Sequence, residues 1–151
     1  MNLRGYRSTD RELLRGPWLA GELLGLPLDD WPALADPTAV PPPAGHDEEL
    51  CVTDGAFVRY TDIDWVHRRA RVEIGVHGGL SDVDDLLAKA VEHGFTSLNL
   101  RRLHGWVTPA ARPAAAALTA AGFRREAVVP AATWFDGAPA AREIWGTIRH
   151  D

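Results

Sequence analysis

The sequence is short of several residue types, and each shortage narrows the range of possible functions. It contains a single cysteine, Cys51, which excludes an internal disulfide and any metal site built from several cysteines. No apolar run approaches the ~20 residues of a membrane-spanning helix, and residues 1–4 do not resemble the start of a signal peptide. The net charge of −5 is dispersed, which argues against a nucleic-acid partner. We therefore expect a cytoplasmic protein with no membrane partner.

The chain has the size and composition of one globular domain. Its 151 residues are 46% hydrophobic and 25% charged, enough to bury a core. Residues 27–46 are rich in proline, with three in a row at 41–43, and this composition predicts a connector rather than a second domain. We expect residues 1–151 to form a single domain, with residues 1–48 as a separate amino-terminal region of it.

Strand and helix patterns alternate along the chain. Asp54-Gly55 is a typical hairpin turn between strand patterns at 49–53 and 56–65. Residues 82–93 carry apolar side chains at helical spacing, and a further helix at 110–121 is closed by Gly122. With two helices expected before residue 27, the order is strand, two helices, three strands, helix, strand, helix and two strands. This order predicts an α+β fold.

Four segments in series resemble the GCN5-related N-acetyltransferase (GNAT) superfamily. They are residues 58–65, Val72-Glu73-Ile74-Gly75, residues 90–103 and Gly122-Phe123-Arg124-Arg125-Glu126. The resemblance covers residues 50–149 and is greatest to the branch that acetylates the amino termini of ribosomal proteins. It implies a central mixed sheet of about six to seven strands flanked by helices. Two central parallel strands of that sheet splay apart, and residues 1–48 cover the acceptor side of the cleft.

The pyrophosphate loop that the resemblance implies is degenerate in this sequence. The family has a Gln/Arg-x-x-Gly-x-Gly/Ala segment there, whose backbone N–H groups hold acetyl-CoA at a helix amino terminus. Here that segment falls on residues 79–83, which contain no arginine, and the acidic run 82–85 follows a capping-box serine, Ser81. We expect no cofactor. If acetyl-CoA does bind, Gly78, Gly79 and Ser81 would contact it.

Two further positions depart from the family pattern. The resemblance implies an asparagine after the second cleft strand and a tyrosine on the next helix that protonates the leaving thiolate. These positions hold Ala111 and Leu118. Neither side chain can donate a proton, so the sequence predicts an acetyltransferase fold that no longer transfers acetyl groups.

The catalytic candidates are Glu73 and His104, one on each expected cleft strand. Glu73 stands where the family often keeps a carboxylate that serves as general base, although a strand glutamate paired with Arg59 or Arg71 would look the same. His104 and Trp106 are two residues apart in a strand, so both project to one side. They form either an imidazole beside a stacking surface or an exposed histidine beside a packed tryptophan.

The substrate-binding candidates are mostly aromatic. They are Trp106, Tyr60, Asp62, Trp31 and Trp18. We expect no metal site, because no histidine spacing of the HExxH kind is present.

Three functions remain open. The first is an enzyme of small-molecule or specialised metabolism that uses the cleft for acid/base chemistry without acetyl-CoA. The second is an acetyl-CoA-dependent N-acyltransferase acting on an amine, and the third is a non-catalytic module that binds a small molecule or a partner. The polar pair in the cleft favours the first. A homodimer through the carboxyl-terminal strands is a further expectation from the resemblance.

Overall fold

The computed structural model describes residues 2–29, 36–78 and 82–150. Its strands are β1 (Arg4–Gly5), β2 (Arg15–Gly16), β3 (Thr38–Ala39), β4 (Glu49–Thr53), β5 (Ala56–Asp64), β6 (Arg69–Val76), β7 (Arg102–Val107), β8 (Arg124–Phe135) and β9 (Ala138–Ile148). Its α-helices are α1 (Val83–Glu92) and α2 (Ala115–Ala120), and 3-10 turns span Ser8–Leu14 and Pro109–Ala111. A single π-helical turn, His93–Ser97, follows α1.

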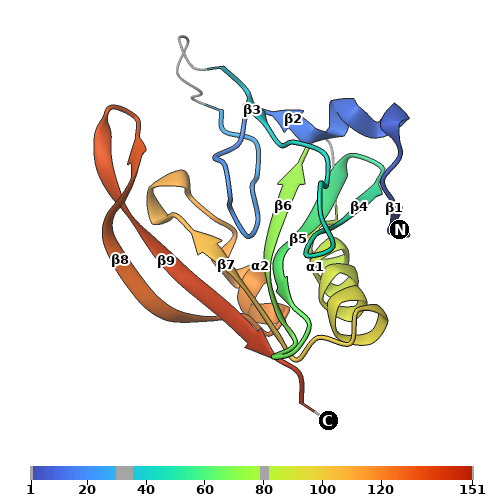
Figure 1. The fold of residues 1–151 in the computed structure, drawn as a ribbon. Coiled ribbons are helices and arrows are strands. Elements are labelled where there is room, and N and C mark those ends of the chain that lie inside the picture. Colours follow the sequence, from blue (N-terminus) through green and yellow to red (C-terminus); the bar gives the residue numbers. More distant parts are fainter. Residues whose placement is uncertain (1, 30–35, 79–81, 151) are drawn as a thin grey trace.

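Seven strands form one mixed sheet in the order β1-β4-β5-β6-β7-β9-β8, and α1 and α2 lie on one face of it (Figure 1). The expected α+β fold is confirmed. The tight turn at Asp54-Gly55 is also confirmed, because it joins β4 to β5 and Gly55 has a positive φ of 83°. β2 and β3 form a separate two-stranded sheet.

Strand alternation gives the sheet a helix-covered apolar face and an opposite face that carries both a second apolar cluster, with Val52 and Phe57, and a polar stretch. Val58, Tyr60, Val72 and Ile74 are among the side chains that pack on the helix-covered face, in the core with Leu86 and Leu87 of α1. The intervening residues of β5 and β6 therefore point to the opposite face. That face is where the amino-terminal region lies in Figure 1.

The parallel strands β6 and β7 separate after a short paired stretch, as the resemblance implied. Their register runs only from Arg69 opposite Arg102 to Arg71 opposite His104. Beyond these pairs the two strands diverge, which leaves backbone groups on both inner edges in need of partners.

The amino-terminal region departs from the predicted order of elements. The first expected helix is a 3-10 turn, and the second, expected before residue 27, is absent from the described part of that region. In its place, residues 22–25 form a turn with an isolated parallel bridge at each end, from Glu22 to Trp106 of β7 and from Gly25 to Gly75 of β6. No helix among the described residues is long and apolar enough to cross a membrane.

Candidate functional site

The cleft between β6 and β7 is filled by the chain's own segment Glu22–Gly25, which we call the insert. Its backbone bonds to both strands: Leu23 N donates to Trp106 O at 2.7 Å, and Gly25 N donates to Ile74 O at 2.8 Å. In return, Ile74 N donates to Glu22 O and Val76 N donates to Gly25 O, at 3.2 and 3.0 Å. Figure 1 shows this part of the chain as the blue loop that descends between β6 and β7. The insert is thus a turn that bridges the two strands through four backbone hydrogen bonds.

Apolar packing holds the insert in place. The side chains of Leu23 and Leu24 are 0% and 4% exposed and belong to the main core. Trp18, 1% exposed, lies so close to Gly75 that a Cβ there would be 2.7 Å from the indole. Returning the two leucines to water would cost about 3–6 kcal/mol, so the insert is a stable part of the fold.

A buried ion pair fixes the start of the insert to β9. Glu22 Oε1 lies 3.3 Å from Arg142 Nη2, and their side chains are 6% and 13% exposed. Glu22 Oε2 accepts from Thr108 N at 3.1 Å, while Arg142 also donates to Ala20 O and stacks over the Trp106 ring at 5.3 Å. Burial raises the pKa of Glu22, and its contacts with Thr108 and Arg142 oppose that rise.

These contacts bear directly on the acetyl-CoA that the fold implies. A ligand between the splayed strands needs free backbone groups on their inner edges, but those of Ile74, Val76 and Trp106 are already bonded to the insert. Leu118, at the position of the family's proton donor, is fully buried. Residues 79–81 lie outside the described residues, and Gly78 is exposed. Among the described residues, the backbone groups that acetyl-CoA would use between β6 and β7 are therefore occupied by the insert.

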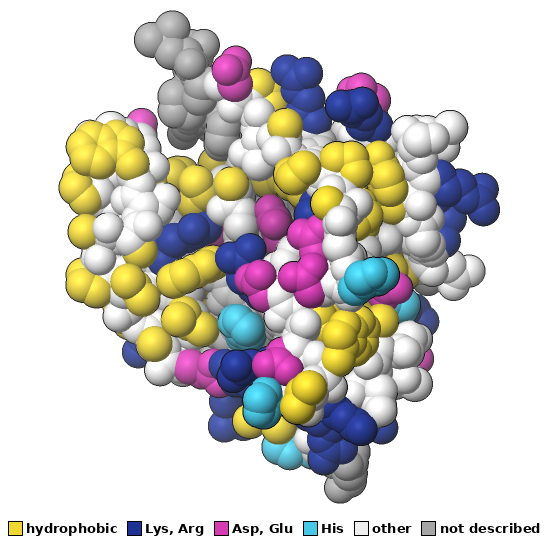
Figure 2. All heavy atoms as spheres, in the orientation of Figure 1, with side chains coloured by type: hydrophobic (Ala, Val, Ile, Leu, Met, Phe, Trp, Pro, Cys, Tyr) yellow, Lys and Arg dark blue, Asp and Glu magenta, His cyan; other side chains and the backbone are white. Residues whose placement is uncertain are grey.

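A polar pocket of about 390 Å³ lies beside the insert, on the face of the sheet away from the helices. Alternate residues of β5 and β6 form its floor, namely Arg59, Thr61, Arg71 and Glu73, with Asp62 at its edge. Gly21, Glu48 and residues 38–41 complete its walls, so the amino-terminal region supplies much of it. Figure 2 shows acidic and basic side chains gathered near the centre of this face.

The two arginines that line the pocket have different partners. Arg59 pairs with Glu48 at 2.9 Å and also donates to Pro41 O. Arg71 donates to Thr61 Oγ1 at 3.1 Å and lies 3.9 Å from Asp62.

Glu73, 9% exposed, accepts from Gly21 N at 3.0 Å and lies opposite Arg59 in the strand register. The three carboxylates and two guanidinium groups lining the pocket leave an excess of one negative charge. Such a pocket favours a cationic ligand.

The structure places the predicted site residues in different surroundings. Glu73 and Asp62 line the pocket. His104 and Trp106 lie on the same face of the sheet but on β7, beyond Arg71, and do not line it. Trp31 and the cofactor candidates Gly79 and Ser81 lie outside the described residues.

Two predicted substrate contacts are corrected by the structure. Tyr60 is 0% exposed and its hydroxyl donates to Ala90 O at 2.6 Å, within the core under α1. Trp18 is also buried, packed against Phe57 and His77. Both aromatic rings stabilise the fold, and neither lines the pocket.

Arg59, Glu48 and the Glu22–Arg142 pair were not among the site residues expected from the sequence. One signal for Arg59 was present, since polar residues recur at every second position of two neighbouring strands, at 59 and 61 and at 71 and 73. Glu22 and Arg142 are 120 residues apart, so no local pattern links them.

Protonation of His104 makes the free energy of unfolding depend on pH. Burial, and then the nearby Arg102 and Arg71, lower its pKa from the ordinary 6.5. The unfolded chain therefore takes up this proton at a higher pH than the folded protein, so the free energy of unfolding falls as the pH drops below about 6.5. We expect a smaller fall in His104→Gln. Urea unfolding at about pH 7.5 and 5.5 measures it, and equal falls in the two proteins would contradict this assignment.

Comparisons with known proteins identify the fold. No protein-family model and no curated protein matches the chain. Among solved structures, it resembles a point mutant of the spermidine N-acetyltransferase SpeG from Vibrio cholerae, with 20% identity, a TM-score of 0.63, and coverage of 68% of this chain and 66% of that one. The chain thus spans slightly less than two thirds of that neighbour's length.

A second neighbour is the spermidine N-acetyltransferase from Vibrio cholerae in a dodecameric structure, also with 20% identity and a TM-score of 0.63, covering 68% of this chain and 66% of that one. The chain therefore shares the fold of GNAT acetyltransferases. The ribosomal-protein branch, which the sequence resemblance favoured, is not supported by these matches.

Proposed function

We propose that this protein binds a small amine in the pocket lined by Glu73 and uses Glu73 as the proton acceptor in acid/base chemistry, without acetyl-CoA between β6 and β7. The observation that carries the proposal is the position of Glu73. It is a nearly buried carboxylate at the floor of a polar pocket, beside a cleft that the insert already fills.

The chemistry of the pocket supports an amine. An ammonium group would bind Glu73 by a charge-assisted hydrogen bond, and transfer of its proton to the carboxylate leaves a neutral, nucleophilic nitrogen. Arg71 is one-third exposed and can hold an anionic group of the same ligand. His104 and Trp106 do not line this pocket, and Trp106 enters the proposal only through its backbone bond to the insert.

A second candidate is acyl transfer from acyl-CoA to the same amine. The structural neighbours favour it, because they are named spermidine N-acetyltransferases. It requires the insert to leave the cleft. Its two core leucines would then leave the core, and the Glu22–Arg142 pair would break. That requirement is why we place it second.

The experiment is calorimetric titration of the whole protein with a panel of small amines, including spermidine and amino acids. We expect at least one amine to bind, and Glu73→Gln to weaken that binding. Absence of binding across the panel would contradict the proposal and would favour a module that binds another ligand.

A homodimer through β8 and β9 is also part of the proposal. These strands form a long arm beyond the rest of the sheet (Figure 1), and Trp134 and Val128 on it are 69% and 53% exposed. A second copy of the chain would cover this apolar surface.

A further inference from the structure

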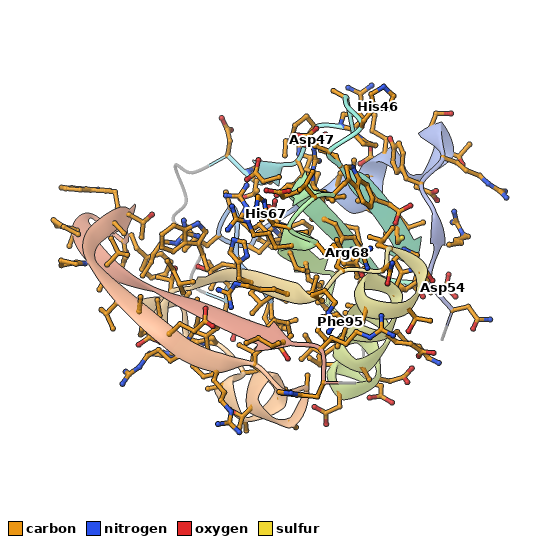
Figure 3. The ribbon with its side chains drawn as sticks, turned by 60° about the horizontal axis from the view of Figure 1, so that its bottom comes forward. His46, Asp47, Asp54, His67, Arg68 and Phe95 are labelled. Carbon is orange, nitrogen blue, oxygen red and sulfur yellow. The ribbon has the colours of Figure 1, made fainter. Side chains whose placement is uncertain are left out.

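The single cysteine lies in a cluster of three potential metal ligands, away from the Glu73 pocket. Glu49 and Cys51 are two residues apart on β4, so both side chains project to the face of the sheet that α1 covers. His93 follows the last residue of α1 and brings its imidazole to them. Figure 3 labels Phe95 in the same π-helical turn, beside the end of α1.

The geometry points to a divalent metal site, and we propose that Glu49, Cys51 and His93 bind Zn²⁺ or a similar ion. The His93 Nε2 atom lies 2.8 Å from Glu49 Oε2 and 3.5 Å from Cys51 Sγ. All three potential ligand atoms lie within 4.8 Å of one another. A thiolate, an imidazole nitrogen and a carboxylate form a ligand set that zinc commonly takes.

The distances are close to those that a tetrahedral ion imposes. Zinc bonds of about 2.0–2.3 Å place neighbouring ligand atoms roughly 3.3–3.6 Å apart. The sulfur–nitrogen distance already has this value, and the carboxylate needs to withdraw by about half an ångström to admit the ion. Glu49 and His93 have side chains 40% and 25% exposed, so the fourth position opens to water.

The surroundings hold the ligands in position. The His93 ring packs against the Tyr60 ring, with centroids 5.6 Å apart, and Tyr60 is fixed by its bond to Ala90 O. Cys51 is 3% exposed within the main core. Ordered neighbours of this kind lower the cost of assembling a metal site.

Metal binding would change the protonation of the Cys51 thiol and of the His93 imidazole. Burial, and then the charge of Glu49, raise the pKa of the Cys51 thiol to about 12, so the sulfur is protonated in the free protein. The ion would displace the thiol proton to solvent and bind the thiolate. The Nε2 lone pair would bind the ion, so a proton on Nε2 would move to Nδ1 in a neutral imidazole or leave to solvent from an imidazolium. One proton or two would be released for each ion bound.

The test is titration of the whole protein with Co²⁺ and then with Zn²⁺. We expect one Co²⁺ per chain, a thiolate-to-cobalt charge-transfer band in the near ultraviolet, and displacement of Co²⁺ by Zn²⁺ at an apparent dissociation constant of about 1 µM or tighter. Calorimetry in buffers of different ionisation enthalpy measures the released protons.

Three variants separate the site from adventitious binding. Cys51→Ser and His93→Gln are conservative, and each should weaken binding by at least about 100-fold and, for Cys51→Ser, remove the charge-transfer band. The matched control is His67→Gln, which alters an exposed histidine–carboxylate pair, with Asp64 at 2.9 Å, that has no thiol beside it. Absence of the band in the wild-type protein would overturn the proposal. Equal Zn²⁺ binding by the wild-type protein and Cys51→Ser would also overturn it.

Discussion

Glu22→Ala is expected to destabilise the protein by about 3–5 kcal/mol, the loss typical when one partner of a buried ion pair is removed. The variant leaves the Arg142 guanidinium, 13% exposed, without its carboxylate, and it removes the acceptor of Thr108 N. Denaturant unfolding at neutral pH measures the change.

The control for Glu22→Ala is Glu92→Ala. Glu92 lies 4.0 Å from Lys89 in an exposed pair on α1, and its loss should change the free energy of unfolding by no more than about 0.5 kcal/mol. A Glu22→Ala effect as small as that of the control would show that the ion pair does not hold the insert.

Glu73→Gln is expected to weaken binding of the amine found by titration by about 10- to 100-fold, the value of one charge-assisted hydrogen bond. The amide keeps the shape of the side chain and can still accept from Gly21 N, so the fold should remain. Any turnover of that amine should fall by about 100- to 10,000-fold, because the proton acceptor is lost.

The matched control for Glu73→Gln is Glu126→Gln. Glu126 is a carboxylate of the same sheet that pairs with Arg102 and lies outside the pocket. Calorimetry and a turnover assay should show no change in this control. Unchanged amine binding in Glu73→Gln would place the ligand elsewhere.

Features that rest on local patterns were predictable from the sequence. The Asp54-Gly55 turn and helix α1 follow from turn chemistry and apolar spacing, and both are present. Only the N-cap residue of the helix differs from the expected one, because the side chain of Asp82 accepts a hydrogen bond from Asp85 N. Glu73 was chosen from the family resemblance, and in the structure it lines the polar pocket.

Features that rest on distant contacts were not predictable. The run Leu19–Leu26 has the composition of a helix, yet residues 22–25 of it form a turn that bridges two strands. The inner edges of β6 and β7 supply hydrogen bonds that a helix would leave unmade. Tyr60 was expected to contact the substrate, although its alternation with Arg59 and Thr61 places it with the core residues.

The most direct test of the account is calorimetric titration of the whole protein with acetyl-CoA, alongside a spermidine N-acetyltransferase as positive control. Because the insert occupies the backbone groups of Ile74, Val76 and Trp106, we predict no binding at millimolar ligand. Binding at micromolar acetyl-CoA would contradict the account, since it would mean that the insert leaves the cleft and that acyl transfer to an amine is the reaction.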